Sequence, residues 1–262
     1  MFRFCSLYSG SSGNSLFVES DTTKILIDCG ESAKKIISAL SQIEINIEDI
    51  TGILITHEHI DHVKSLATLS TKYNIPIYIH KETFNALAEQ KSKIKIENVN
   101  FFDFSKNFNV GDLKIHPFPT PHDAASPCGF NIFKGRKKIS IATDLGHITP
   151  EIMSNLEKSK FILLESNYDP NTLKCSSYPY SLKERISGPY GHLSNEVAGK
   201  TISHLINFGL ETAMLGHLSK ENNFPELAYK TVMEEIINNK NENNINLSVA
   251  TRYNPTAIID II

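Results

Sequence analysis

The sequence has few cysteines, no long apolar segment and no large excess of charge. Its four cysteines (Cys5, Cys29, Cys128 and Cys175) are scattered without C-x-x-C spacing, which argues against a disulfide framework and against a cysteine-ligated zinc site. No apolar run approaches the roughly 20 residues of a membrane-spanning helix, and the N-terminal residues do not read as a signal peptide. We therefore expect a cytoplasmic protein with reduced, buried thiols.

The charge balance excludes a generic basic coat for nucleic acid. Lysine and arginine number 26 against 29 acidic residues, which gives a formal net charge of −3. A nucleic-acid substrate is not excluded, because divalent ions bound at an acidic site would add local positive charge. The 262 residues can bury a large core, and no linker or internal repeat divides them. We expect one domain over residues 1–262.

One short segment carries the strongest chemical signal. Three histidines and an aspartate fall within His57–His62, directly after the apolar run Gly52–Ile55. In an extended loop His57 and His59 point to the same side, because side chains alternate with a period of two. Imidazole nitrogens and carboxylate oxygens are ligands of zinc-like divalent ions. The alternative is a polar loop rich in histidine by chance, but structural histidines usually occur singly.

The hydrophobic pattern predicts an α/β fold. The expected helices have apolar residues at helical spacing or a Pro or Gly at an end, and cover Ser32–Leu40, Val63–Tyr73, Asn195–Phe208 and Pro225–Asn238. Short apolar runs predict strands at Leu16–Val18, Ile25–Ile27, Ile75–Ile79, Leu113–Phe118, Gly129–Phe133, Ile139–Ala142, Phe161–Leu164 and Leu247–Ala250. Residues 166–193 are expected to form loops and short helices near the site, and Asn238–Asn246 an exposed loop. This order favours two sheets flanked by helices.

The motif His-x-His-x-Asp-His after a short strand is similar to the signature of the metallo-β-lactamase superfamily. Further residues match that family's motifs in order: Asp28 after a strand, His122 in Pro-Thr-Pro-His-Asp, Asp144 and His217. The resemblance implies an αββα four-layer sandwich with two divalent metal ions, zinc or manganese, with iron also possible. The ligands it implies are His57, His59 and His122 for one ion, Asp61, His62 and His217 for the other, and Asp144 bridging both.

Such a pair of ions would make the protein a hydrolase. A water between the ions would lose a proton near neutral pH and become the nucleophile, since bound zinc lowers its pKa to about 7. Asp61 is expected to orient this hydroxide as well as to bind metal. Asp28 is expected to fix a ligand histidine, with a simple turn aspartate as the alternative.

Two further segments bear on the substrate. The small residues of Tyr8–Ser15 would let Ser12 and Asn14 approach a substrate closely, although a plain flexible turn explains them equally well. In the second segment Arg185 could contact a phosphate, and His192 could act as a general acid. Ser194 would cap the following helix, whose N-terminus attracts phosphate. The alternative for His192 is a histidine that packs near a helix start.

Together these segments resemble the YycJ/WalJ branch of the superfamily, which is associated with 5′-to-3′ exonuclease action on DNA. One departure is Ser65, where the family pattern has glycine; it follows the ligands and leaves them intact. The resemblance implies a DNA substrate, with no membrane and no inferable stable protein partner.

Two other readings stay open at this point. The same metal pair could serve a small-molecule hydrolase that cleaves a thioester, lactam, lactone or cyclic phosphodiester. A glutathione thioesterase would need a set of cationic residues, and no clear set is present. A non-enzymatic, metal-loaded regulator is the third reading, but purely structural metal sites are closed and usually mononuclear.

Overall fold

The strands form two mixed sheets. The computed structural model describes residues 1–239 and 245–262, so part of the predicted loop Asn238–Asn246 lies outside the described residues. One seven-stranded sheet has the order β14 (Ile259–Asp260), β1 (Phe2–Tyr8), β2 (Ser15–Ser20), β3 (Lys24–Ile27), β4 (Gly52–Leu54), β5 (Ile77–His80), β6 (Val99–Phe102). The other has the order β13 (Asn246–Val249), β12 (Thr212–Gly216), β11 (Phe161–Glu165), β10 (Lys137–Ala142), β9 (Cys128–Lys134), β8 (Leu113–Pro119), β7 (Phe108–Val110).

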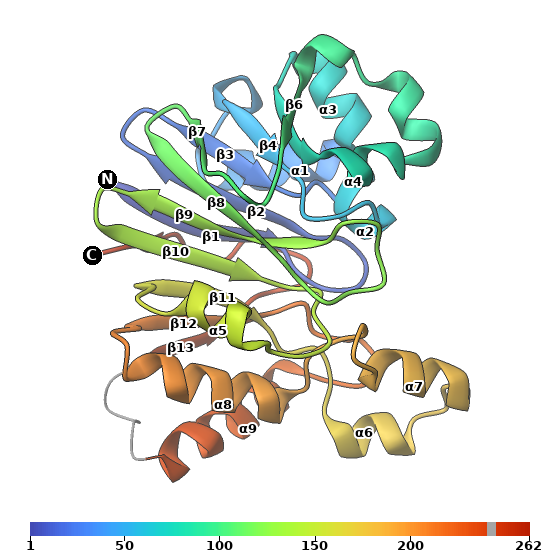
Figure 1. Cartoon of the computed structure of the whole chain (residues 1–262), viewed down its shortest axis with the longest axis vertical. Helices are drawn as coiled ribbons and strands as arrows, with labels where there is room; N and C mark the ends of the chain where they lie inside the picture. The colour runs from blue at the N-terminus through green and yellow to red at the C-terminus, as the bar shows by residue number, and fades with distance from the viewer. Residues whose placement is uncertain (240–244) are drawn as a thin grey trace.

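Helices cover the outer faces of both sheets (Figure 1). Those on the side of the first sheet are α1 (Ala33–Gln42), α2 (Ile60–Val63), α3 (Leu66–Tyr73) and α4 (Lys81–Asn85), together with 3₁₀ turns at Ile47–Asp49, Ala88–Lys93 and Ile96–Asn98. The second sheet is covered by α5 (Pro150–Leu156), α8 (Asn195–Ile206) and α9 (Pro225–Asn238), while α6 (Pro170–Cys175) and α7 (Tyr180–Ser187) project at one end. The predicted αββα four-layer sandwich is confirmed. Among the described residues, no helix is both long and apolar enough to cross a membrane.

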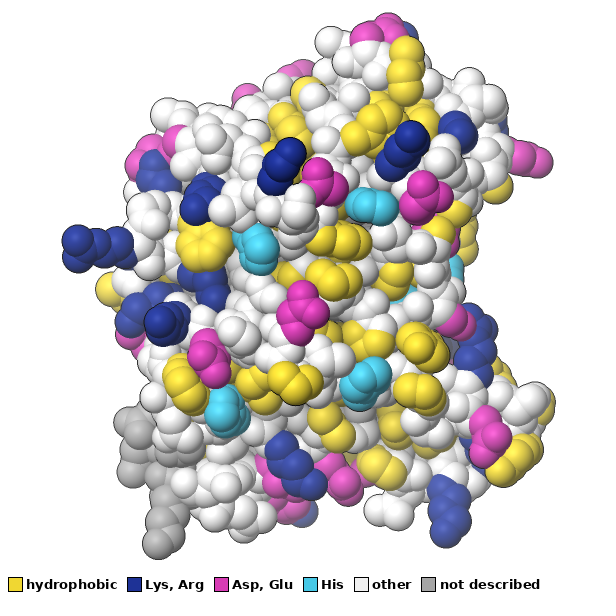
Figure 2. Space-filling view, in the orientation of Figure 1, with side chains coloured by type: hydrophobic (Ala, Val, Ile, Leu, Met, Phe, Trp, Pro, Cys, Tyr) yellow, Lys and Arg dark blue, Asp and Glu magenta, His cyan; other side chains and the backbone are white. Residues whose placement is uncertain are grey.

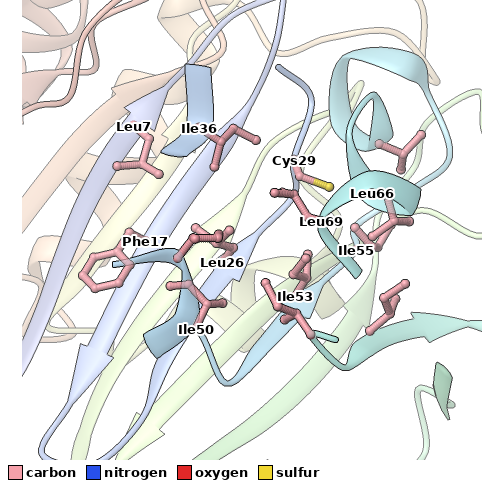
Figure 3. Close-up of a cluster of buried hydrophobic side chains, with 14 of the residues drawn as sticks. Leu7, Phe17, Leu26, Cys29, Ile36, Ile50, Ile53, Ile55, Leu66 and Leu69 are labelled. Carbon is pink, nitrogen blue, oxygen red and sulfur yellow. The ribbon is translucent and has the colours of Figure 1, made fainter. Parts of the chain in front are cut away.

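The alternation of side chains along each strand builds the layers. Phe17 and Leu26 pack with the helices of the first sheet, in the cluster drawn in Figure 3. Their neighbours Leu16, Val18 and Ile25 point the other way and pack between the two sheets. A third cluster joins the second sheet to its own helices. Because both faces of these strands are buried, the strands read in sequence as continuous apolar runs rather than alternating ones.

One predicted helix was wrong in its extent. Val63–Tyr73 was expected to be continuous, but α2 ends at Val63 and α3 begins at Leu66. The break lies at Ser65, whose backbone N–H (3.0 Å) and Oγ (3.1 Å) both donate to the carbonyl of Cys29. The serine that departs from the family pattern therefore ties this break to the end of β3. The helix Pro225–Asn238 is confirmed, and Asn195–Phe208 is confirmed except that it ends at Ile206.

The parallel strands place their carboxyl ends together. Strands β3, β4 and β5 run parallel in one sheet, and β10, β11 and β12 in the other. Loops after such strands meet at one edge, where binding sites of α/β sheets usually lie. On the face drawn in Figure 2, positive and negative side chains are both scattered over the surface, in keeping with the small net charge.

Candidate metal centre

The candidate ligands follow four strands. His57 and His59 lie in the loop after β4, and Asp61 and His62 lie in α2, which directly follows that loop. The other three, His122, Asp144 and His217, follow β8, β10 and β12 respectively. The structure brings all seven together.

Three residues at these strand ends adopt left-handed backbone conformations. Asp28, Asp144 and His217 have φ values of 61°, 56° and 54°. This conformation costs a non-glycine residue on the order of 1 kcal/mol and is concentrated at functional sites. Asp144 and His217 face the candidate metal centre, whereas Asp28, which follows β3, contacts His62 Nδ1 from behind.

Among the described residues four overlapping groups of side chains could hold a metal ion, and two of these groups match the expected ligand sets. The ligand atoms of His57, His59 and His122 lie within 4.8 Å of one another, and so do those of Asp61, His62 and His217. These are the two sets that the resemblance implies. A tetrahedral zinc ion with ligands at 2.0–2.1 Å would hold its ligand atoms about 3.3 Å apart. Within the first set, His57 Nε2 lies 3.1 Å from His59 Nδ1.

Asp144 faces both groups. Its Oδ2 lies 3.3 Å from His62 Nε2, and its Oδ1 lies 3.4 Å from His217 Nε2 and 3.8 Å from His122 Nε2. In the described part of the chain, Asp144 Oδ2 and His217 Nε2 are buried without a hydrogen-bond partner. A buried polar atom without a partner is costly, and a divalent cation would satisfy both atoms. The residues present therefore fit a pair of divalent ions.

Hydrogen bonds at Nδ1 orient two of the histidines that follow β4, His57 and His62. Asp28 Oδ2 lies 2.7 Å from His62 Nδ1 and also accepts from Thr56 Oγ1 at 2.8 Å. Because the threonine hydroxyl donates to Asp28, it accepts from His57 Nδ1, 3.0 Å away. Both histidines thus carry their proton on Nδ1 and leave Nε2 for a metal ion. Asp28 is therefore placed to fix the ring of His62, as expected from the sequence.

Two of the remaining ligand histidines, His122 and His217, are held in the same way. The backbone carbonyl of Gly191 lies 3.0 Å from His122 Nδ1, and Glu165 Oε1 lies 2.9 Å from His217 Nδ1. Again Nε2 is left for an ion.

Sequence reasoning missed Glu165, a fully buried carboxylate at the end of β11. Its Oε1 also lies 2.7 Å from His192 Nδ1, and its Oε2 accepts from the backbone N–H groups of Leu145 and Leu193, each at 3.1 Å. Burial raises the pKa of Glu165, but the charge of His192 and the hydrogen bonds from the histidines lower it further, so the net shift is downward. A signal was available, because Glu165 ends a buried apolar strand as Asp28 and Asp144 do.

The predicted substrate residues divide into two groups. Arg185 and His192 line a cavity of about 260 Å³ over the ligands, with Ser11, Asp123, Tyr178 and Ser219 among its other walls. Arg185 Nε donates to Asp123 Oδ2 at 2.6 Å. The predicted contacts Ser12, Asn14 and Ser194 lie outside this lining and remain predictions.

Those three residues have other neighbours in the structure. Asn14 Nδ2 lies 3.1 Å from His62 Nε2, beside the ligands. Ser194 caps α8 by accepting from Val197 N–H, as expected, and Ser12 is exposed on the first hairpin.

The two ligand sets differ in their protonation before metal binds. Burial lowers the pKa of His57 well below its usual value and also lowers that of His122. Burial also lowers the pKa of His62, but the carboxylates of Asp144 and Asp28 outweigh it and raise the pKa to about 9. His217 is likewise raised well above its usual pKa by Asp144 against the effect of burial.

We predict that the two metal ions release different numbers of protons. The raised pKa values of His62 and His217 favour their protonated rings at neutral pH, so the ion bound by them should displace about two protons. The ion bound by His57, His59 and His122 should displace fewer. The affinity of the Asp61, His62 and His217 set should therefore rise more steeply with pH up to about 9. Calorimetric titration in two buffers of different ionisation enthalpy measures this; equal proton release would contradict it.

Comparisons with known proteins agree with this geometry. A model of the beta-lactamase superfamily domain matches residues 23–217. The chain is 36% identical to Exodeoxyribonuclease WalJ of Streptococcus pneumoniae serotype 2, over 90% of this chain and 88% of that protein. It is 35% identical to Exodeoxyribonuclease YycJ of Bacillus anthracis, over 88% of each chain.

Solved structures share the fold. The metallo-beta-lactamase fold protein YhfI from Bacillus subtilis superposes with a TM-score of 0.71 at 15% identity, over 97% of this chain and 99% of that one. The family match, the relatives and the shared fold lead to one conclusion: this chain belongs to the metallo-β-lactamase superfamily and is similar to its WalJ and YycJ members.

Proposed function

We propose that this protein is a metal-dependent exonuclease that removes nucleotides from the 5′ end of DNA. The observation that carries the proposal is the pair of ligand sets that meet at Asp144 beneath an open cavity. Such a site could hydrolyse several kinds of bond, and the relatives named as exodeoxyribonucleases favour a phosphodiester of DNA as the substrate. We further propose that residues 1–262 act as one catalytic domain in the cytoplasm.

The residues proposed to hold two divalent ions, zinc or manganese with iron as a third candidate, are His57, His59, Asp61, His62, His122, Asp144 and His217. When bound, such ions lower the pKa of a coordinated water to about 7 and stabilise the negative charge that develops on phosphate oxygens.

The walls of the cavity supply the remaining chemistry. Because His192 Nδ1 is hydrogen-bonded to Glu165, only the other ring nitrogen, Nε2, can exchange a proton with a substrate. Burial lowers the pKa of His192, but Glu165 outweighs it and raises the pKa, which favours the protonated ring at neutral pH. His192 can then give a proton to the oxygen that leaves the scissile phosphate. Arg185, whose side chain is 63% exposed, can exchange its contact with Asp123 for a phosphate.

The test uses purified protein, duplex DNA with a 5′-phosphate, and Zn²⁺ or Mn²⁺ in separate reactions. A label on the 5′-terminal nucleotide should be released first and as a mononucleotide, while a 3′ label should stay on long products until late. Release of the 3′ label first would show that digestion starts at the 3′ end and not at the 5′ end. Intact DNA in both metals, with turnover of a thioester or lactone, would overturn the proposal in favour of a small-molecule hydrolase.

A further inference from the structure

A second cavity lies beside the candidate metal centre. Its volume is about 430 Å³. Ser219 lines both cavities, and the first hairpin loop separates them, since Ser9 lines the second cavity and Ser11 lines the first. A strand of nucleic acid that places a phosphate in the metal centre could therefore continue across Ser219 into the second cavity.

The two cavities differ in charge. The metal cavity is lined by three carboxylates, Asp61, Asp123 and Asp144, and by one guanidinium, that of Arg185. The described lining of the second cavity contains the cations Lys220 and Arg252 and no carboxylate. A polyanion that leaves the metal centre would thus meet positive charge in this cavity.

The second cavity also exposes aromatic rings. Phe224 and Tyr253 line it and are 52% and 62% exposed. Leu218, Pro225 and Val249 add an apolar wall. Exposed aromatic rings next to cations are the combination by which proteins bind single-stranded nucleic acid, because every base has a π-face that can stack.

The surroundings of the cavity are held in place. The Phe224 N–H donates to Asn223 Oδ1 at 3.0 Å, and Asn223 is itself buried. The Arg252 guanidinium donates to the Leu218 carbonyl, and a Cβ at Gly10 would lie only 2.5 Å from Arg252 Nη1. Glycine at this position therefore lets the hairpin loop pack directly on Arg252. A wall ordered before binding loses little entropy when a base stacks on it.

We propose that this second cavity binds a base of a nucleotide that flanks the scissile phosphate, with Phe224 and Tyr253 as stacking surfaces and Lys220 beside the backbone. The proposal rests on the proposed function, because it assigns a subsite for the same DNA strand. The proposal implies that the DNA is single-stranded where it leaves the metal centre.

The absence of tryptophan from the chain allows a direct test. In Phe224→Trp the introduced indole is the only one, and in metal-free protein no DNA is consumed during the titration. A short single-stranded oligonucleotide should quench its fluorescence, whereas an abasic oligonucleotide of equal length, which keeps the phosphates, should not. The matched control is Tyr229→Trp, an exposed aromatic position on α9 outside the cavity lining, which should respond to neither. Equal quenching by both oligonucleotides, or no quenching at Phe224→Trp, would overturn the proposal.

A second measurement separates this subsite from the exonuclease activity. Phe224→Ala should weaken oligonucleotide binding to metal-free protein roughly tenfold, the range expected for loss of one stacked base. Phe224→Leu should lose nearly as much affinity for the oligonucleotide, because leucine keeps apolar bulk but has no ring. If Phe224→Ala has a much lower melting temperature than the wild type, Phe224→Leu is used in its place. Binding unchanged in both would overturn the subsite even if the wild-type protein digests DNA. Base-dependent quenching by a protein that does not digest DNA would instead contradict the proposed exonuclease activity and still support the base-binding subsite.

Discussion

Asp61→Ala is expected to abolish DNA degradation, with kcat/KM falling on the order of a thousandfold or more, because a metal ion supplies several kcal/mol of transition-state stabilisation. Asp61 Oδ2 lies 3.6 Å from His62 Nε2 and 3.7 Å from His217 Nε2, so it completes their set. Burial raises the pKa of Asp61, but the neighbouring imidazoles of His217 and His62 lower it further, which keeps the carboxylate ionised. Its side chain is also 23% exposed, so it can reach both an ion and the substrate.

Metal content makes this prediction specific. Elemental analysis of Asp61→Ala after dialysis should find about one ion where the wild type holds two, because only one ligand set is damaged. Asp61→Asn keeps the shape and removes the charge, and should show the same loss. Asp49→Ala removes an exposed carboxylate that pairs with Lys24, and should retain both metal and activity. Full activity in Asp61→Ala would remove Asp61 from the chemistry and undermine the two-ion proposal.

Much of the metal centre could be predicted because its information is local. Four of the seven candidate ligands lie within His57–His62, in the loop and the short helix α2 that follow the apolar strand. Asp144 and His217 were identified through the family resemblance, whose motifs place each of them after a buried strand. The hydrophobic pattern predicted two sheets flanked by helices, whereas the four-layer αββα arrangement was implied by the family resemblance.

The supporting contacts could not be predicted, because they join residues that are far apart in the sequence. Glu165 lies 27 residues from His192 and 52 from His217. The group that orients His122 is a backbone carbonyl, at Gly191, which leaves no mark in a side-chain pattern. The break in the helix at Ser65 likewise depends on a carbonyl 36 residues away, at Cys29. Periodicity reports which face of a segment is buried, but not which polar atoms meet across the fold.

The second large effect is expected at Glu165. We predict that Glu165→Gln lowers metal affinity and kcat/KM by roughly 10–100-fold, the cost typical of losing a group that supports a metal-bound histidine. The carboxylate accepts four hydrogen bonds: Oε1 from the Nδ1–H groups of His192 and His217, and Oε2 from the N–H groups of Leu145 and Leu193. A glutamine must turn its NH₂ donor towards one of these two pairs, and each pair consists of donors.

Each orientation of the amide has its own consequence. If the NH₂ faces the two imidazoles, His217 must accept at Nδ1 and carry its proton on Nε2, the atom that faces Asp144 and the ion. If it faces the backbone, two buried N–H groups lose their acceptor, which costs about 1–3 kcal/mol each. Competition with a chromogenic chelator would measure the ion affinity, and thermal melting of the metal-free protein would measure the second cost. A large loss of affinity with an unchanged melting temperature would identify the first orientation. Wild-type affinity together with wild-type stability would show that Glu165 supports neither histidine.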